Sequence, residues 1–199
     1  MAVDWVRRAR EAVAGKYGPI LPHVEAVVAH AGDLATHYPQ ADREVVVVAA
    51  WLHDLARVEG EADGHATRGA ELAREFLAAA GYPPARANLV AWAILHHTDP
   101  VYGPERGELP LEARILYDAD KMDRVRGYYL AELLVTVGTR VAGEGGHWLA
   151  HLPSARELYV GLFESLYTER AREAVQADYE ACLDFLDRVT LATGRREGR

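Results

Sequence analysis

Residues 45–54 read VVVVAAWLHD, a run of eight apolar side chains that ends in an imidazole and a carboxylate. Four consecutive valines suit a buried strand as well as a buried helix, because periodicity alone cannot separate the two. The two alanines and Leu52 extend the run to helical length, and Asp42 precedes it as a residue that can cap a helix. We therefore predict a buried helix that begins after Asp42 and reaches His53 and Asp54.

The polar pair at the end of this run requires partners. Burying an unpaired charge is costly, so such groups normally pair, hydrogen-bond or coordinate a metal. Neutral imidazole and carboxylate together form a mixed nitrogen and oxygen site for a divalent ion. Adjacent helical residues point about 100° apart, so His53 and Asp54 can share an ion only near a helix end. We expect two further ligands from elsewhere in the chain.

The rest of the chain shows mainly helical spacing of apolar residues, with no repeat and no convincing run of alternating strand residues. Ser154 with Glu157 has the spacing of a capping box, so we expect a helix to begin there. The fold class is therefore all-α, in a single domain of residues 1–199. The C-terminal helices, over about residues 154–193, close the core or form a dimer face. Further helices are expected over about residues 3–16, 22–37, 65–80, 84–97, 111–123 and 128–137.

The amino-acid composition and net charge exclude several classes of function. Half of the 199 residues are hydrophobic and 26% are charged, which is typical of a folded protein. A net charge of −8 argues against nucleic acid as the main partner, but it is compatible with a small phosphorylated ligand. The single cysteine, Cys182, excludes an internal disulfide framework and a cysteine-based zinc site. The N-terminus lacks a signal-peptide pattern and no apolar run could span a bilayer, so we expect a cytoplasmic protein without a membrane partner.

Candidate carboxylate ligands lie in residues 117–123, YDADKMD. On a helix, Asp120 and Asp123 share a face, whereas Asp118 points nearly the opposite way. A solvated acidic face is one interpretation. The apolar residues around the segment instead indicate that at least one of these acids lies against the core.

Two upstream histidines compete for the remaining ligand position. His23 and His30 are seven residues apart and share a helix face, but they lie roughly 10 Å apart along the axis and cannot both bind one ion. His23 lies at the start of its helix, where clefts form, and is the better candidate. His30 is expected to pack elsewhere.

The order of these residues resembles the HD-domain superfamily of metal-dependent phosphohydrolases, whose signature is His…His-Asp…Asp on a helical core. The resemblance covers about residues 20–126, and within the superfamily the chain is most similar in pattern to the small bacterial HD hydrolases. It includes, in order, the segments PHVEAVVAHAGDLA, VVVVAAWLHDLAR, GHATRGAELAREFLAAAGYP, LVAWAILHH and ILYDADKMD. The resemblance implies the metal ligands His23, His53, Asp54 and Asp120. Asp120 is chosen because it stands in an Ala-Asp-Lys context, which leaves Asp123 as a supporting acid.

The resemblance also implies the surroundings of the ion. His65, His96 and His97 match positions that in some branches line the pocket or bind a second metal. We favour one ion over two, with these histidines acting on water or phosphate as catalytic groups. Arg57 is expected to bind substrate phosphate, because a guanidinium suits phosphate and is a poor general base. Lys121, beside Asp120, is expected to bind substrate phosphate as well.

The predicted function is hydrolysis of a phosphate ester or anhydride by metal-activated water, with a nucleotide as the expected substrate. The cofactor would be one divalent ion or two, drawn from Mn, Mg, Co, Ni and Fe. A di-iron oxygenase and a non-catalytic ligand-sensing protein are the alternatives. The expected partner is a small phosphorylated substrate, and a homodimer is compatible with the apolar C-terminal helices.

Overall fold

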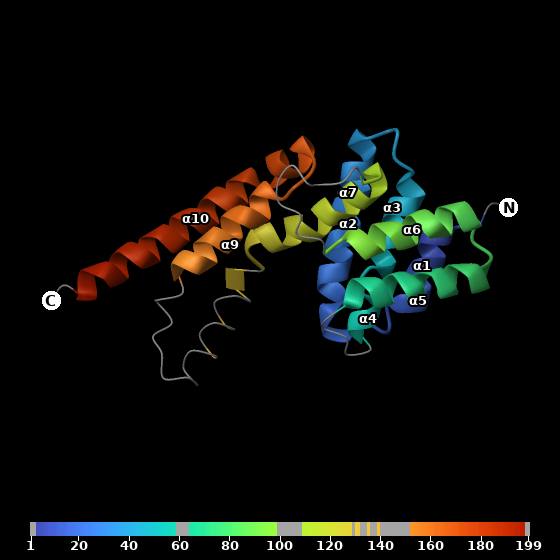
Figure 1. Cartoon of the computed structure of the whole chain (residues 1–199), viewed down its shortest axis with the longest axis horizontal. Coiled ribbons are helices and arrows are strands. Elements are labelled where there is room, and N and C mark those ends of the chain that lie inside the picture. Colours follow the sequence, from blue (N-terminus) through green and yellow to red (C-terminus); the bar gives the residue numbers. More distant parts are fainter. Residues whose placement is uncertain are drawn as a thin grey trace. The chain divides into compact units, whose positions relative to one another are not determined.

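The computed structural model describes residues 3–58, 64–98, 109–128 and 152–197, together with Leu130, Ala131, Val135 and Thr139. All regular elements in these described residues are helical (Figure 1). The prediction of an all-α fold is confirmed. The chain divides into two compact units, Met1–Asp120 and Lys121–Arg199. The single domain expected from the sequence stays a prediction.

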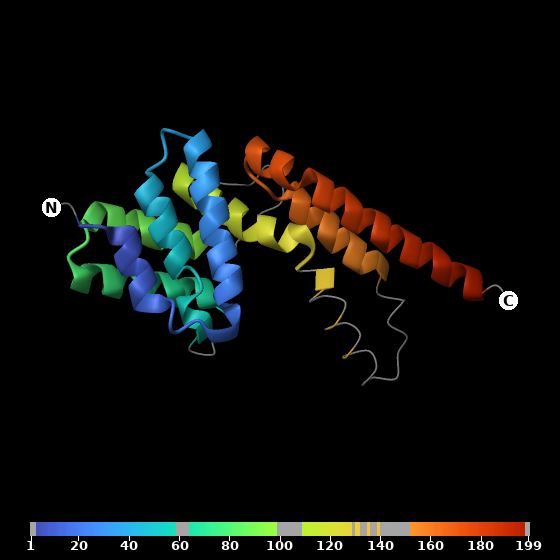
Figure 2. The ribbon, with the colours of Figure 1, turned by 180° about the vertical axis from the view of Figure 1, so that it is seen from behind.

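The first unit is a group of helices around α3. Helix α3 contacts α1, α2 and α6, while α5 lies along α6 (Figures 1 and 2). The short α4 packs against α5. The elements are α1 (Trp5–Val13), a 3-10 turn (Gly18–Ile20), α2 (Leu21–His37), α3 (Arg43–Leu52), α4 (Leu55–Val58), α5 (His65–Ala80), α6 (Pro84–His96) and α7 (Leu111–Asp123), whose last three residues belong to the second unit.

Helix α3 is the buried centre of this unit. Every residue from Val45 to Leu52 is buried, because neighbouring helices cover α3 on several sides. A helix that is apolar on all faces is stable only in such a position, which explains the valine run. The helix interpretation is therefore correct, although α3 ends at Leu52. His53 and Asp54 lie in the turn that follows and leads into α4.

Asp42 fixes the start of α3, as predicted. Its carboxylate accepts hydrogen bonds from the backbone N–H groups of Glu44 and Val45, at 3.1 and 3.3 Å. Arg86 of α6 donates to the same carboxylate at 2.5 Å. The backbone N–H of Asp42 donates to Glu112 of α7 at 2.9 Å. One N-cap residue thus joins three helices.

We expect Asp42→Ala to lower the free energy of unfolding by about 1 kcal/mol at pH 7, the usual effect of removing an N-cap. Burial alone would raise the pKa of Asp42, but the hydrogen bonds from Arg86, Val45 and Glu44 lower it overall. A lowered folded-state pKa gives stability that is present above the ordinary aspartate pKa and is lost as the pH falls through the folded value. Urea denaturation should therefore show the difference between wild type and variant at pH 7 and a smaller difference near pH 3. The same difference at both values would contradict this account.

The second unit contains a π-helical turn, Arg124–Tyr128, followed by α9 (Leu152–Glu164) and α10 (Glu169–Glu197). Helix α10 contacts both of the other elements. The buried Tyr159 hydroxyl donates to the Val125 carbonyl, and Phe163 stacks on Tyr179 with ring centroids 3.9 Å apart. These contacts join the π-helical turn, α9 and α10.

The predicted capping box at Ser154 is wrong. Helix α9 begins at Leu152, so Ser154 lies inside it. Pro153 explains the earlier start, because a proline in the first helical turn has a preset φ and needs no N–H partner there. The predicted helix over 128–137 lies largely outside the described residues.

The described helices include no segment that is both long enough and apolar enough to cross a membrane.

Candidate metal centre

Three parts of the first unit bring the predicted ligands together. His23 comes from the first turn of α2, His53 and Asp54 from the turn after α3, and Asp120 from α7. The His23 Nε2 atom lies 3.2 Å from Asp120 Oδ1 and 3.9 Å from Asp54 Oδ2. The His53 Nε2 atom lies 3.6 Å from Asp54 Oδ2. Residues separated by almost a hundred positions thus meet around one carboxylate.

Two further histidines face the other oxygen of Asp54. The Nε2 atoms of His65 and His97 lie 3.7 and 3.8 Å from Asp54 Oδ1. His65 begins α5, and His97 directly follows α6. Within the described residues, two sets of side chains have ligand atoms close enough to hold a metal ion, and Asp54 belongs to both. The sets are His23, His53 and Asp54, and Asp54, His65 and His97.

The ends of two helices orient two of these rings. The Nδ1 atom of His53 lies 2.8 Å from the carbonyl oxygen of Ala50, and Nδ1 of His97 lies 2.5 Å from that of Ile94. A carbonyl only accepts, so in a neutral ring Nδ1 carries the proton and Nε2 keeps its lone pair. Each histidine thereby adds a side-chain donor to a carbonyl in the last turn of its helix. The same bonds aim both Nε2 atoms at Asp54.

This arrangement fits a bound cation. The Nε2 atom of His53 is buried and makes no hydrogen bond to any described residue. It faces Asp54 Oδ2, so an unprotonated nitrogen and an anionic oxygen stand opposite each other. A metal ion satisfies both atoms, and the carbonyl bond at Nδ1 is the outer-shell contact usual for metal-binding histidines.

The electrostatics of the pair agree with this fit. Burial lowers the pKa of His53 to about 4. Burial acts to raise the pKa of Asp54, but His53, His97 and Arg57 oppose it, and the net pKa is lowered well below the usual range. At neutral pH the imidazole is therefore neutral and the carboxylate ionised. These are the protonation states that metal binding requires.

Two supporting residues are absent from the sequence predictions. The buried Tyr17 hydroxyl donates to the carbonyl of Trp51 at 2.5 Å, next to the turn that carries the site. Gly69 lets α5 approach that turn, because a Cβ atom placed there would lie only 3.1 Å from the carbonyl oxygen of His53. A glycine inside a helical pattern indicates close packing, so the sequence pattern could have identified Gly69. The partner of Tyr17 is 34 residues away, and its contact has no local sequence pattern.

The other predicted residues differ in their placement. The Nε atom of Arg57 lies 3.1 Å from Asp54 Oδ1. The ring of His96 packs against Trp92, with centroids 4.9 Å apart, and His96 belongs to neither set of ligand atoms. Lys121 is buried on α7 and begins the second unit.

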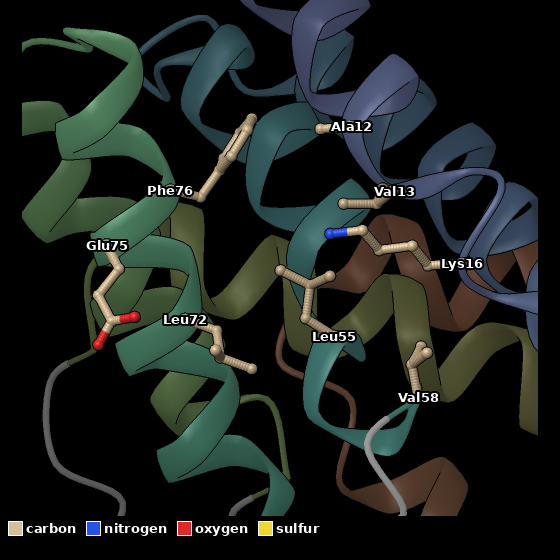
Figure 3. A pocket seen from close by; sticks show the side chains of 8 residues that line it. All are labelled: Ala12, Val13, Lys16, Leu55, Val58, Leu72, Glu75 and Phe76. Atoms are coloured by element: carbon tan, nitrogen blue, oxygen red, sulfur yellow. The ribbon is translucent and has the colours of Figure 1, made fainter.

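A separate cavity of about 250 Å³ lies between α1, α4 and α5 (Figure 3). Its walls are mainly apolar, and the Lys16 side chain extends across it toward Leu55 (Figure 3). We call His23, His53, Asp54, His65, His97 and Asp120 the cluster. None of these six residues lines the cavity. The lining residues are Ala12, Val13, Lys16, Leu55, Val58, Leu72, Glu75 and Phe76.

Curated relatives match a large part of this chain but only a small part of their own length. The chain is similar to a bifunctional uridylyltransferase/uridylyl-removing enzyme of Bradyrhizobium diazoefficiens, with 32% identity over 131 residues. It is similar to the protein of the same name from Nitrobacter winogradskyi, with 29% identity over 163 residues. These matches cover 65% and 77% of this chain, but only 14% and 17% of the relatives.

Solved structures share the fold across nearly the whole chain. A predicted HD superfamily hydrolase from an uncultured Thermotogales bacterium has 23% identity and a TM-score of 0.60, with 95% of this chain and 91% of that chain covered. Bacillus subtilis YpgQ in complex with ADP has 19% identity and a TM-score of 0.66, with 93% of both chains covered. At these identities the likeness establishes the fold alone.

One protein family, described as HD domain, matches this chain over residues 20–125, which is more than half of the sequence. These bounds nearly coincide with the span of the resemblance noted in the sequence, and they include all six histidine and aspartate residues of the cluster. The chain belongs to the HD-domain family.

Proposed function

We propose that this protein is a metal-dependent phosphohydrolase that cleaves a phosphate ester or anhydride, with nucleotides as the substrate class. The observation that carries the proposal is the pair of electron-rich atoms, His53 Nε2 and Asp54 Oδ2, that face each other 3.6 Å apart in a buried position. A metal ion between these two atoms would satisfy the imidazole lone pair and the carboxylate charge together.

The proposed ligands are His23, His53, Asp54 and Asp120. When bound there, a divalent ion would lower the pKa of a coordinated water and polarise a phosphoryl oxygen. The two aspartates supply the charge that compensates a divalent ion, and the two imidazoles add neutral donors. Three of these residues, His23, His53 and Asp54, have ligand atoms within 4.8 Å of one another, and Asp120 Oδ1 lies 3.2 Å from His23 Nε2.

Three histidines are proposed for proton transfer and phosphate binding. His65 and His97 both face Asp54 Oδ1, so they stand beside the proposed ion. The fixed Nδ1–H of His97 leaves its Nε2 as the atom that can accept a proton. His96 is the third of the predicted catalytic histidines, and its ring position beside Trp92 suits a contact farther from the ion.

The proposed substrate class is supported by the relatives. Two curated relatives are described as uridylyl-removing enzymes, and one structural neighbour was solved with ADP. Each of those descriptions concerns a nucleotide or a nucleotidyl group. We propose the same chemical class here, with Arg57 and Lys121 as phosphate contacts. For Lys121 the proposal rests on its position next to Asp120 in the sequence.

We expect Arg57→Ala, loaded with one equivalent of divalent metal at His23, His53, Asp54 and Asp120, to raise KM by about tenfold to a hundredfold. Removing a charge-assisted hydrogen bond typically costs about 1.5–3 kcal/mol, which corresponds to that range. Steady-state kinetics with the best substrate, together with metal analysis of the same sample, provides the measurement. An unchanged KM would argue against a phosphate contact at Arg57.

A di-iron oxygenase is the second candidate, because the two sets of ligand atoms share Asp54 as a bridging carboxylate would. Purified protein that holds two irons and consumes oxygen with a substrate would support it. A phosphate-release screen separates the two functions, since only the phosphohydrolase releases phosphate without oxygen.

The deciding experiment combines metal analysis of the purified protein with phosphate release from nucleotides and simple phosphoesters. Each reaction is run with added Mn²⁺, Mg²⁺, Co²⁺ or Ni²⁺, and again after chelation. The proposal predicts metal-dependent release that chelation abolishes and added metal restores. If the protein binds metal but hydrolyses no phosphoester, the metal centre stands and the phosphohydrolase proposal fails.

A further inference from the structure

The carboxylate of Asp54 has two chemically different sides. Its Oδ2 atom faces His53 and His23, and a second carboxylate, Asp120, lies 3.2 Å from His23 on this side. Its Oδ1 atom faces His65, His97 and the guanidinium of Arg57. The first side therefore joins two carboxylates with two imidazole rings. The second side offers two imidazole rings and an oxygen that already contacts a fixed cation.

Arg57 is held at Oδ1 by the short helix α4. Its backbone N–H donates to the Asp54 carbonyl at 3.1 Å, and its Nε lies 3.1 Å from Asp54 Oδ1. Leu55 and Val58, on either side of Arg57 in the sequence, line the apolar cavity between α1, α4 and α5 (Figure 3). Leu55 is buried whereas the Arg57 side chain is partly exposed, so α4 turns Leu55 inward and leaves the guanidinium beside Asp54. The contact with Asp54 follows from how α4 packs.

A metal ion and the guanidinium compete for the same oxygen. An ion on the second side would have to approach Asp54 Oδ1 to about 2.0–2.6 Å. It would then stand within a few ångströms of a permanent positive charge, and among the described residues the set on this side offsets that repulsion with one carboxylate, Asp54, which Arg57 already contacts. The first side carries no such conflict, since Asp120 adds a negative charge there.

We propose that Arg57 takes the place of a second cation, so that the cluster binds one divalent ion, on the side of His23, His53, Asp54 and Asp120. This inference rests on the proposed metal centre and specifies how many ions it holds. It assigns His65 and His97 to proton transfer and substrate binding and not to a second ion. Arg57 is here a positioning and charge-compensating residue at Asp54.

The test is the stoichiometry of Mn²⁺ alone, without substrate. Wild-type protein and Arg57→Ala are stripped with chelator, titrated with Mn²⁺ by calorimetry, desalted and analysed for bound manganese. We expect one Mn²⁺ per wild-type chain and two per Arg57→Ala chain. Electron paramagnetic resonance adds an independent signature, because two neighbouring Mn²⁺ ions give an exchange-coupled signal that a single ion cannot give.

Two further variants make the result specific. Arg57→Ala combined with His65→Ala should return to one ion, because it removes a ligand of the second side. Arg68→Ala, which removes an arginine paired with Glu71 on α5, serves as the matched control and should hold one ion. Circular dichroism confirms that each variant is folded.

The failures can be told apart. Two ions in the wild type, or a single ion in folded Arg57→Ala, would overturn the role of Arg57 while leaving the metal centre in place. No bound manganese in either protein, with other divalent ions equally absent, would overturn the metal centre and this inference with it.

Discussion

Asp54→Ala is expected to abolish metal binding and to reduce phosphoester hydrolysis by at least about a thousandfold, since a catalytic metal contributes several kcal/mol to transition-state stabilisation. The reason is the central position of this carboxylate. Its oxygens face His23 and His53 on one side and His65 and His97 on the other. Without it, His53, His65 and His97 lose the carboxylate that each of them faces, and Asp120 beside His23 remains as the only proposed carboxylate ligand. Metal analysis and phosphate release, measured on the same preparation, provide the readout.

Asp33→Ala is the matched control, because Asp33 is an exposed aspartate on α2 and lies outside the cluster. It should retain both metal and activity. Since Asp54→Ala also leaves buried polar atoms, its helical content and urea midpoint must be recorded. Full hydrolysis by a folded, metal-free Asp54→Ala protein would refute the proposed mechanism.

Gly69→Val is expected to lower the free energy of unfolding by about 1–3 kcal/mol, the usual cost of overpacking a core. A Cβ atom at position 69 would lie 3.1 Å from the carbonyl oxygen of His53 and 3.4 Å from a methyl carbon of Ile94. The carbonyl is backbone and cannot rotate away, so α5 itself must move. That movement displaces His65, which begins α5, and should weaken activity as well as stability.

The control for Gly69→Val is Ala78→Val, which places the same side chain at an exposed position of α5. It tests the smaller cost of valine in a helix without the contact to His53. Urea denaturation of both variants gives the comparison, and phosphate release tests the site. Equal stability losses in the two variants would contradict the close-approach explanation.

Much of the site could be predicted because its chemistry is concentrated in short segments. The adjacent His53 and Asp54 follow a run that can only be buried, so their need for partners was readable from the sequence. The choice of His23 over His30 depended on the geometry of one helix, and the choice of Asp120 depended on the family resemblance. The structure places both chosen residues within 3.2 Å of each other. Their role as ligands stays a proposal.

Other features were beyond the reach of sequence patterns. The start of α9 was misplaced because Ser154 and Glu157 have capping spacing, while Pro153 in the first turn favours an earlier start. His96 and His97 are equivalent in the sequence, yet only the ring nitrogen of His97 is placed opposite Asp54. Adjacent residues at a helix end point in different directions, and the packing of α6 against α3 and α5 selects which one faces inward.

The sequence by itself determined the all-α class and the burial of residues 45–52, which depend on local chemistry: apolar length, helical spacing and residue type. The full set of metal ligands came from the family resemblance and stays a proposal. Only the tertiary structure decided that Asp54 presents one oxygen to His23 and His53 and the other to His65, His97 and Arg57. That division depends on the packing of five separate helices and the turns between them. No local pattern encodes it, because each contact joins segments whose distance apart is set by the whole core.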